Sequence, residues 1–141
     1  ILFQLNEYDC DGIDYNNSCI KVANYIKDKF NFKKGNFIHG DFMDYNFRKK
    51  YDVILSLANH HTYDGGITDT KHYFNKIKSL LNPGGEIYLE SHHPQIETEE
   101  VFYALYKKYL SENFKIIRNI KYENKNFLDN GRSFLLLKDQ I

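Results

Sequence analysis

The sequence predicts an α/β fold in which a doubly wound, mostly parallel sheet ends in an antiparallel hairpin. Three observations support this prediction. Residues 51–59 form a largely apolar run with no charge after Asp52, as in a strand buried on both faces of a parallel sheet. Strand-like and helix-like segments alternate along most of the chain. The last two strand-like segments, 114–122 and 132–138, follow each other without a helix, which is typical of an antiparallel pair.

The first half of the chain predicts two short strands around one helix. We expect the tail of a helix at 1–7, a strand at 10–14, a helix ending near Phe30, and a strand at 37–41. Asn16 and Asn17 are both candidates for the cap of the helix, because an asparagine side chain accepts a hydrogen bond from an unpaired backbone N–H group. Both predicted strands end in an acid, Asp14 and Asp41.

The second half predicts two further strand and helix pairs before the hairpin. A helix is expected from about Thr70 to Leu81, because its apolar residues recur at helical spacing. The turn Asn82–Gly85 ends it, since proline cannot continue a helix and glycine accepts a left-handed conformation. A strand at 86–91 and a helix from Glu99 to about Leu110 follow. Asn130 and Gly131 suit the hairpin turn.

Composition limits the classes of protein that fit. The 141 residues suffice for one domain, 1–141, with one hydrophobic core. Lysine plus arginine equals aspartate plus glutamate, 19 each, which argues against a surface dominated by nucleic-acid or lipid phosphates. Cys10 and Cys19 lack a zinc-binding spacing and favour a reduced, cytoplasmic protein. No apolar stretch approaches the ~20 residues that span a bilayer.

Polar, proton-handling side chains follow two of the apolar strands. Asn59, His60 and His61 end the first of these segments, and Glu90, Ser91, His92 and His93 end the second. Ligands of open α/β sheets bind outside the carboxyl ends of the strands. We therefore expect these side chains to lie where chemistry is done.

Several short motifs occur in an order that resembles the class I S-adenosylmethionine-dependent methyltransferases, which have a Rossmann-like fold. These motifs are Gly12–Asp14, Gly40–Phe42, Tyr51–Asn59, Leu81–Gly85 and Gly131–Leu136. The likeness spans almost the whole chain. It implies an enzyme that transfers a methyl group from S-adenosylmethionine to an acceptor.

The resemblance also assigns roles to individual residues. Asp14 would accept hydrogen bonds from the ribose hydroxyls, Asp41 would meet the adenine amino group, and Phe42 would cover the adenine ring. Asn59 would contact the cofactor through its backbone. The residues expected near the methyl acceptor are His60, His61, His92 and His93.

Other interpretations of these residues stay open. Asp14 also suits a helix cap or a nicotinamide dinucleotide, and Phe42 also suits a core position. His60 and His61 cannot both face the acceptor if the strand stays regular, because neighbouring strand residues face opposite sides.

The alternative function is a metal-binding or non-catalytic Rossmann-like protein. In it the pairs His60/His61 and His92/His93 would be the ligands, although side chains of adjacent histidines diverge. We assign no metal site from the sequence. The identity of the acceptor, small molecule or macromolecule, and the oligomeric state do not follow from the residues.

One part of the expected fold precedes the chain. In the family that the motifs resemble, a first strand and a glycine-rich loop lie ~20 residues before an acid such as Asp14. Only 13 residues precede Asp14 here, so we expect that strand and loop upstream of Ile1. In that family the strand lies between the second and the fourth. We therefore expect residues 1–141 alone not to form a stable, cofactor-binding monomer.

Overall fold

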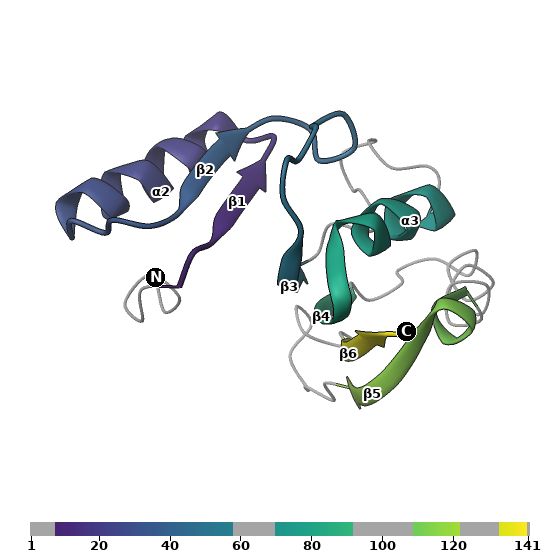
Figure 1. Ribbon diagram of the computed structural model, residues 1–141. Coiled ribbons are helices and arrows are strands. Elements are labelled where there is room, and N and C mark those ends of the chain that lie inside the picture. Colours follow the sequence, from purple (N-terminus) through teal and green to yellow (C-terminus); the bar gives the residue numbers. More distant parts are fainter. Residues whose placement is uncertain (1–7, 58–69, 92–108, 122–132, 141) are drawn as a thin grey trace. The chain divides into compact units, whose positions relative to one another are not determined.

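The computed structural model describes residues 8–57, 70–91, 109–121 and 133–140 (Figure 1). The chain divides into two compact units, Ile1–Asn46 and Phe47–Ile141. The first unit contains β1 (Asp11–Asp14), α2 (Asn17–Lys29) and β2 (Asn36–His39). The second contains β3 (Tyr51–Leu57), α3 (Thr70–Leu80), β4 (Leu81–Ser91), β5 (Phe114–Lys121) and β6 (Ser133–Asp139).

The first unit is a β-α-β unit, as predicted. β1 and β2 pair in parallel from Asp11 with Asn36 to Asp14 with His39, and α2 packs on both strands. A Cβ on Gly12 would lie 3.1 Å from the Phe37 ring. The lack of a side chain at Gly12 on β1 therefore leaves room for the ring of Phe37 on β2. β2 ends at His39, two residues earlier than predicted, because the chain turns at Asp41.

α2 begins after an asparagine cap. The side-chain oxygen of Asn16 accepts a hydrogen bond from the backbone N–H of Ser18 at 2.9 Å, and Asn17 is the first helical residue. Phe30 caps the other end, and Ile20 is the buried residue of the helix. The structure therefore selects Asn16 from the two predicted caps and confirms the end of the helix near Phe30.

The second unit is built on a mixed sheet with the strand order β3-β4-β6-β5. β3 and β4 are parallel, and β6 is antiparallel to both β4 and β5. The predicted antiparallel pair at the end of the chain is confirmed, with its second strand inserted beside β4. The single-domain prediction is left open by the division into two units.

One face of this sheet packs against α3. Tyr73 and Phe74 are buried, and the hydroxyl of Tyr73 lies 2.6 Å from the hydroxyl of Ser56 on β3. Phe74 makes edge contact with Phe114, their ring centroids 6.5 Å apart. The other buried apolar residues of this core are Ile77, Leu81, Ile87, Leu89, Leu110, Leu135 and Leu137.

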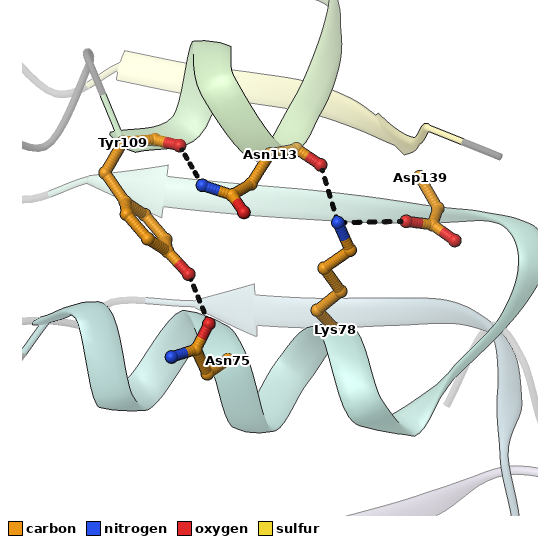
Figure 2. A network of polar contacts seen from close by, with 5 residues as sticks. All are labelled: Asn75, Lys78, Tyr109, Asn113 and Asp139. Carbon is orange, nitrogen blue, oxygen red and sulfur yellow. Dashed lines mark hydrogen bonds and ion pairs between the residues drawn. The ribbon is translucent and has the colours of Figure 1, made fainter.

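A polar network also holds α3 in place (Figure 2). Lys78 donates a hydrogen bond to the backbone oxygen of Asn113 at 3.3 Å and lies 3.9 Å from Oδ1 of Asp139 on β6. The Tyr109 hydroxyl donates to Oδ1 of Asn75 at 2.5 Å. Helical residues 109–113 and β6 are thereby fixed to the same helix.

Three predicted features are corrected. The helix expected to end near Leu110 continues to Asn113. The strand predicted at 86–91 is β4, which begins earlier, at Leu81, because this residue already pairs with Tyr51. Its regular ladder starts at Glu86, after a turn in which Gly84 has φ 75°.

The third correction concerns β3, which is not buried on both faces. Its residues Val53, Leu55 and Leu57 are 44%, 42% and 51% exposed. They alternate with Ile54 and Ser56, whose side chains point to the opposite face, the one covered by α3. Within the described ranges, β3 has β4 as its hydrogen-bonded neighbour and β1 has β2. None of the helices within these ranges is long and apolar enough to cross a membrane.

Candidate functional site

The predicted site residues divide into two groups. Asp14, Asp41 and Phe42 lie in the described part of the first unit. The others lie outside the described residues, and their predicted roles stay predictions: Asn59, His60, His61, His92 and His93.

Asp14 stands at the carboxyl end of β1, where the chain turns into α2. One of its side-chain oxygens, Oδ1, accepts a hydrogen bond from the backbone N–H of Asn16 at 2.7 Å. Its backbone oxygen accepts one from the N–H of Gly40 at 3.1 Å, which extends the ladder beyond His39. The helix-cap interpretation is thus partly correct, since the carboxylate is held by the turn that precedes α2.

Asp41 has the same kind of contact at the end of the neighbouring strand. Its Oδ1 accepts a hydrogen bond from the backbone N–H of Met43 at 2.6 Å, and its backbone oxygen accepts one from the N–H of Tyr45 at 3.0 Å. Asp41 is exposed and Phe42 is half-buried. The turn therefore presents the carboxylate of Asp41 to solvent, and the half-buried Phe42 follows it in the chain.

The two carboxylates share a chemical property. In both Asp14 and Asp41 one oxygen is fixed by a backbone amide, and Oδ2 makes no hydrogen bond within the described ranges. A carboxylate oxygen accepts more than one hydrogen bond, so each group keeps acceptor capacity. Because both follow the ends of paired parallel strands, the edge suits a ligand that carries hydroxyl or amino donors.

His39 lies at the same end of the paired strands and is not among the predicted site residues. It pairs with Asp14 across the two strands, and its Nε2 lies 3.0 Å from the backbone oxygen of Tyr15. This contact ties the end of β2 to the loop that follows β1. The available signal was its position: a polar ring nitrogen two residues before Asp41, at a strand end.

The ends of β3 and β4 are also adjacent. Leu57 pairs with Glu90 in the parallel ladder, so the two segments that carry the predicted histidines leave the sheet from neighbouring strands. No group of three or more histidine, cysteine or acidic residues in the described part of the chain is arranged to hold a metal ion. The four histidines of the metal hypothesis lie outside that part.

Comparison with known proteins gives one family and one curated relative. The model of a family described as "Methyltransferase domain" matches residues 1–131. The chain is 31% identical over 131 residues to malonyl-[acyl-carrier protein] O-methyltransferase 2 of Ilyobacter polytropus. This alignment covers 80% of the chain and 49% of the relative, so the chain spans about half the length of that protein.

Solved structures give the fold. The N-methyltransferase NodS from Bradyrhizobium japonicum matches with a TM-score of 0.74 and 13% identity, over 94% of this chain and 74% of NodS. NodS in complex with S-adenosyl-L-homocysteine matches with a TM-score of 0.67 and 10% identity, over 99% of this chain and 84% of NodS. A methyltransferase from Pyrococcus furiosus matches with a TM-score of 0.65 and 16% identity, over 95% and 64%. The predicted α/β fold is confirmed.

Proposed function

Because the chain belongs to the methyltransferase domain family, we propose that its protein transfers a methyl group from S-adenosylmethionine to an acceptor. The observation that carries this proposal is the edge formed by Asp14 and Asp41, two carboxylates that are oriented by backbone amides and retain open oxygens. The family match over residues 1–131 includes both of them.

The residues of the edge fit the nucleoside part of the cofactor. The carboxylate of Asp14 offers acceptors for two vicinal hydroxyl groups of a ribose. In this proposal Asp41 offers an acceptor for the amino group of adenine, and the ring of Phe42 covers the adenine face. His39 holds the loop after Asp14 and so acts as a positioning residue.

S-adenosylmethionine supplies a methyl group that is bound to a positively charged sulfur. When the methyl group is transferred, this sulfur becomes part of a neutral thioether, the leaving group. The acceptor atom forms the new bond to the methyl carbon, the carbon–sulfur bond breaks, and its electron pair stays on sulfur. The protein's part is to align the acceptor with the methyl group and to take up its proton where it has one. We propose His60, His61 or His92 for this proton transfer, because histidine titrates near neutral pH.

The nature of the acceptor is a separate proposal. The curated relative is named as an O-methyltransferase of a malonyl group on acyl-carrier protein. A carboxylate of a carrier-bound acyl group is therefore the first acceptor to assay.

The two cysteines, Cys10 and Cys19, are both free thiols, which supports a reducing compartment such as the cytoplasm.

The test is a calorimetric titration of S-adenosyl-L-homocysteine into the whole native protein and three variants. Asp14→Asn and Asp41→Asn keep an oxygen for the backbone amide and lose the charge and one acceptor. Each should weaken binding by roughly 10-fold to 100-fold, since hydrogen bonds to charged groups contribute about 1.5–3 kcal/mol. Asp28→Asn, on the exposed surface of α2, is the matched control and should bind as the native protein does.

The proposal is wrong if the folded native protein does not bind S-adenosyl-L-homocysteine. It also fails in its assignment of the edge if Asp14→Asn and Asp28→Asn bind with the same affinity. In the first case the alternative function becomes the leading one. Metal analysis of the purified protein, with a His60→Ala/His92→Ala variant, would then test the histidine pairs as ligands.

A further inference from the structure

The outer side of α2 and the turn after it carry exposed lysines. Residues 17–36 contain five lysines and a single aspartate, in a chain whose net charge is zero. Four of these lysines are exposed: Lys21, Lys29, Lys33 and Lys34. Within the described residues 8–57 none of the four forms an ion pair with an acid, so their positive charge is open to a partner.

Apolar side chains lie among these lysines. Val22, Tyr25 and Phe30 are 58%, 63% and 60% exposed. A helix has about 3.6 residues per turn, so Val22, Tyr25 and Lys29 follow one another along the side of α2 that lies opposite the buried Ile20. Nζ of Lys29 lies 5.6 Å from the centroid of the Tyr25 ring. We call the four exposed lysines, together with Val22, Tyr25 and Phe30, the basic strip.

Hydrogen bonds and a ring stack fix the shape of the basic strip. Nζ of Lys27 donates to the backbone oxygen of Gly35 at 2.5 Å, and the backbone N–H of Phe32 donates to the backbone oxygen of Lys27 at 3.0 Å. The rings of Phe30 and Phe32 stack with their centroids 5.9 Å apart. The turn is thereby tied to the end of α2, and a surface that is fixed before binding loses little conformational entropy when a partner docks.

We propose that the basic strip docks an acidic protein surface, and that this surface belongs to the carrier protein that holds the acyl group to be methylated. The inference rests on the carrier-bound acceptor of the proposed function. A folded carrier is too large to enter a site beside the cofactor, so the enzyme needs a separate surface to bind it. The strip lies close in the chain to the candidate site, because α2 begins at Asn17, three residues after Asp14.

The charge distribution favours a protein over a nucleic acid as the partner. Carboxylates on a protein surface can each meet one lysine, and an apolar residue between them can contact Val22 and Tyr25, as in interfaces with an apolar centre and a polar rim. The first unit as a whole contains seven acids and five lysines, so a long polyanion would be repelled beyond the strip. A local acidic patch suits this distribution better.

Binding of malonyl acyl-carrier protein to the whole native protein tests the proposal without turnover. Fluorescence anisotropy of the labelled carrier gives the affinity at low and at high salt. We expect saturable binding that weakens with salt, because salt screens exposed charges, and a loss of roughly 10-fold in Lys21→Glu/Lys29→Glu. Lys50→Glu/Lys115→Glu is the matched control, since it makes the same change of net charge at exposed lysines of the second unit. The control should bind the carrier as the native protein does.

The proposal is overturned if the carrier does not bind at low salt, or if the strip variant and the control bind it equally. In the first case, lysine-dependent binding of anionic lipid vesicles or of a single-stranded RNA would assign the basic strip to a different kind of partner.

A thermal melt checks that the strip faces solvent in the whole protein. Tyr25→Gln keeps a residue that suits helices and removes the exposed ring. It should shift the Tm by less than about 2 °C and still weaken carrier binding. A large drop in the Tm would show that another part of the molecule covers the strip, which would overturn the proposal.

Methyl transfer separates this proposal from the proposed function. Malonyl-coenzyme A presents the same acyl thioester without the carrier protein. We expect Lys21→Glu/Lys29→Glu to raise the KM for the malonyl carrier roughly 10-fold, while kcat and the KM for malonyl-coenzyme A stay unchanged. Equal losses with both acceptors would overturn docking at the strip. A native protein that binds S-adenosyl-L-homocysteine and the carrier but methylates neither acceptor would overturn the proposed acceptor and keep the strip as the docking surface of the carrier.

Discussion

Ser56 and Tyr73 are joined by a buried hydrogen bond. Their hydroxyl oxygens lie 2.6 Å apart, and the two residues are 1% and 2% exposed. Ser56 is the buried polar residue of the described core, and it lies on β3 just before the segment that carries Asn59 and His60. The bond fixes the end of that strand to the first turns of α3.

The variant Tyr73→Phe should lower the stability of the protein. It leaves the Ser56 hydroxyl without its partner inside the core, and an unsatisfied buried hydroxyl costs about 1–3 kcal/mol. Chemical denaturation of the native protein and the variant measures this loss. The double variant Ser56→Ala/Tyr73→Phe should lose less than the sum of the two single variants. Additive losses would mean that the two hydroxyls do not interact.

Gly85 should not tolerate a side chain. A Cβ at this position would lie 2.9 Å from the backbone oxygen of Asn82 and 3.1 Å from that of Asp52. Gly85→Ala must therefore shift backbone, and we expect a loss of about 1–3 kcal/mol in unfolding free energy. Gly40→Ala is the control, because the nearest atoms to its Cβ are 4.0 Å away. Thermal melts in which the two variants are equally stable would show that the surroundings of Gly85 have room for a side chain.

The local elements of the fold were predictable because their signals are local. Asn16 before α2, the turn at Asn82–Gly85 and the two adjacent final strands each depend on a few neighbouring residues. The position of β6 between β4 and β5 was not predictable in the same way, since it depends on pairing between Leu135 and Leu89, far apart in sequence. The exposed face of β3 also contradicts the local signal, because burial depends on which segments cover the strand.

The candidate site shows the same division. Asp14 and Asp41 were predicted because each ends a predicted strand, and the structure has Asp14 as the last residue of β1 and Asp41 two residues after the end of its partner β2. The contact of His39 with Tyr15 was missed, since it joins two residues that are brought together by the parallel pairing. Asp14, for which the family resemblance predicts a contact with ribose, also accepts a hydrogen bond in the turn before α2. One oxygen can hold the turn while the other stays available to a ligand, so the two interpretations of Asp14 are compatible.

Lys78 should stabilise the second unit by joining three elements (Figure 2). It donates to Asn113, lies 3.9 Å from Asp139 and sits over the ring of Phe114, 5.6 Å from its centroid. Oδ1 of Asp139 is buried and accepts no hydrogen bond, so the lysine is its charge partner. Lys78→Met keeps the aliphatic part and removes the charge. Because the lysine side chain is 37% exposed, solvent screens the pair, and we expect a loss on the order of 1 kcal/mol.

Urea denaturation of Lys78→Met measures this loss, and the double variant Lys78→Met/Asp139→Asn provides the control. The second substitution removes the carboxylate that the first one leaves unpaired. The double variant should therefore recover part of the stability lost in Lys78→Met. If Asp139→Asn instead adds its own full loss, the charge of Lys78 does not act through Asp139.

Asn16 should contribute to stability through its side chain, whereas Asn17 should not. The Asn16 oxygen accepts from the N–H of Ser18 at 2.9 Å, while Asn17 is exposed in the first turn of α2. Asn16→Ala removes a cap and should cost about 1 kcal/mol, and Asn17→Ala should change the unfolding free energy by less than about 0.5 kcal/mol. Denaturation curves of the two variants give the comparison directly. Equal losses in the two variants would mean that the Asn16 side chain does not stabilise the start of α2.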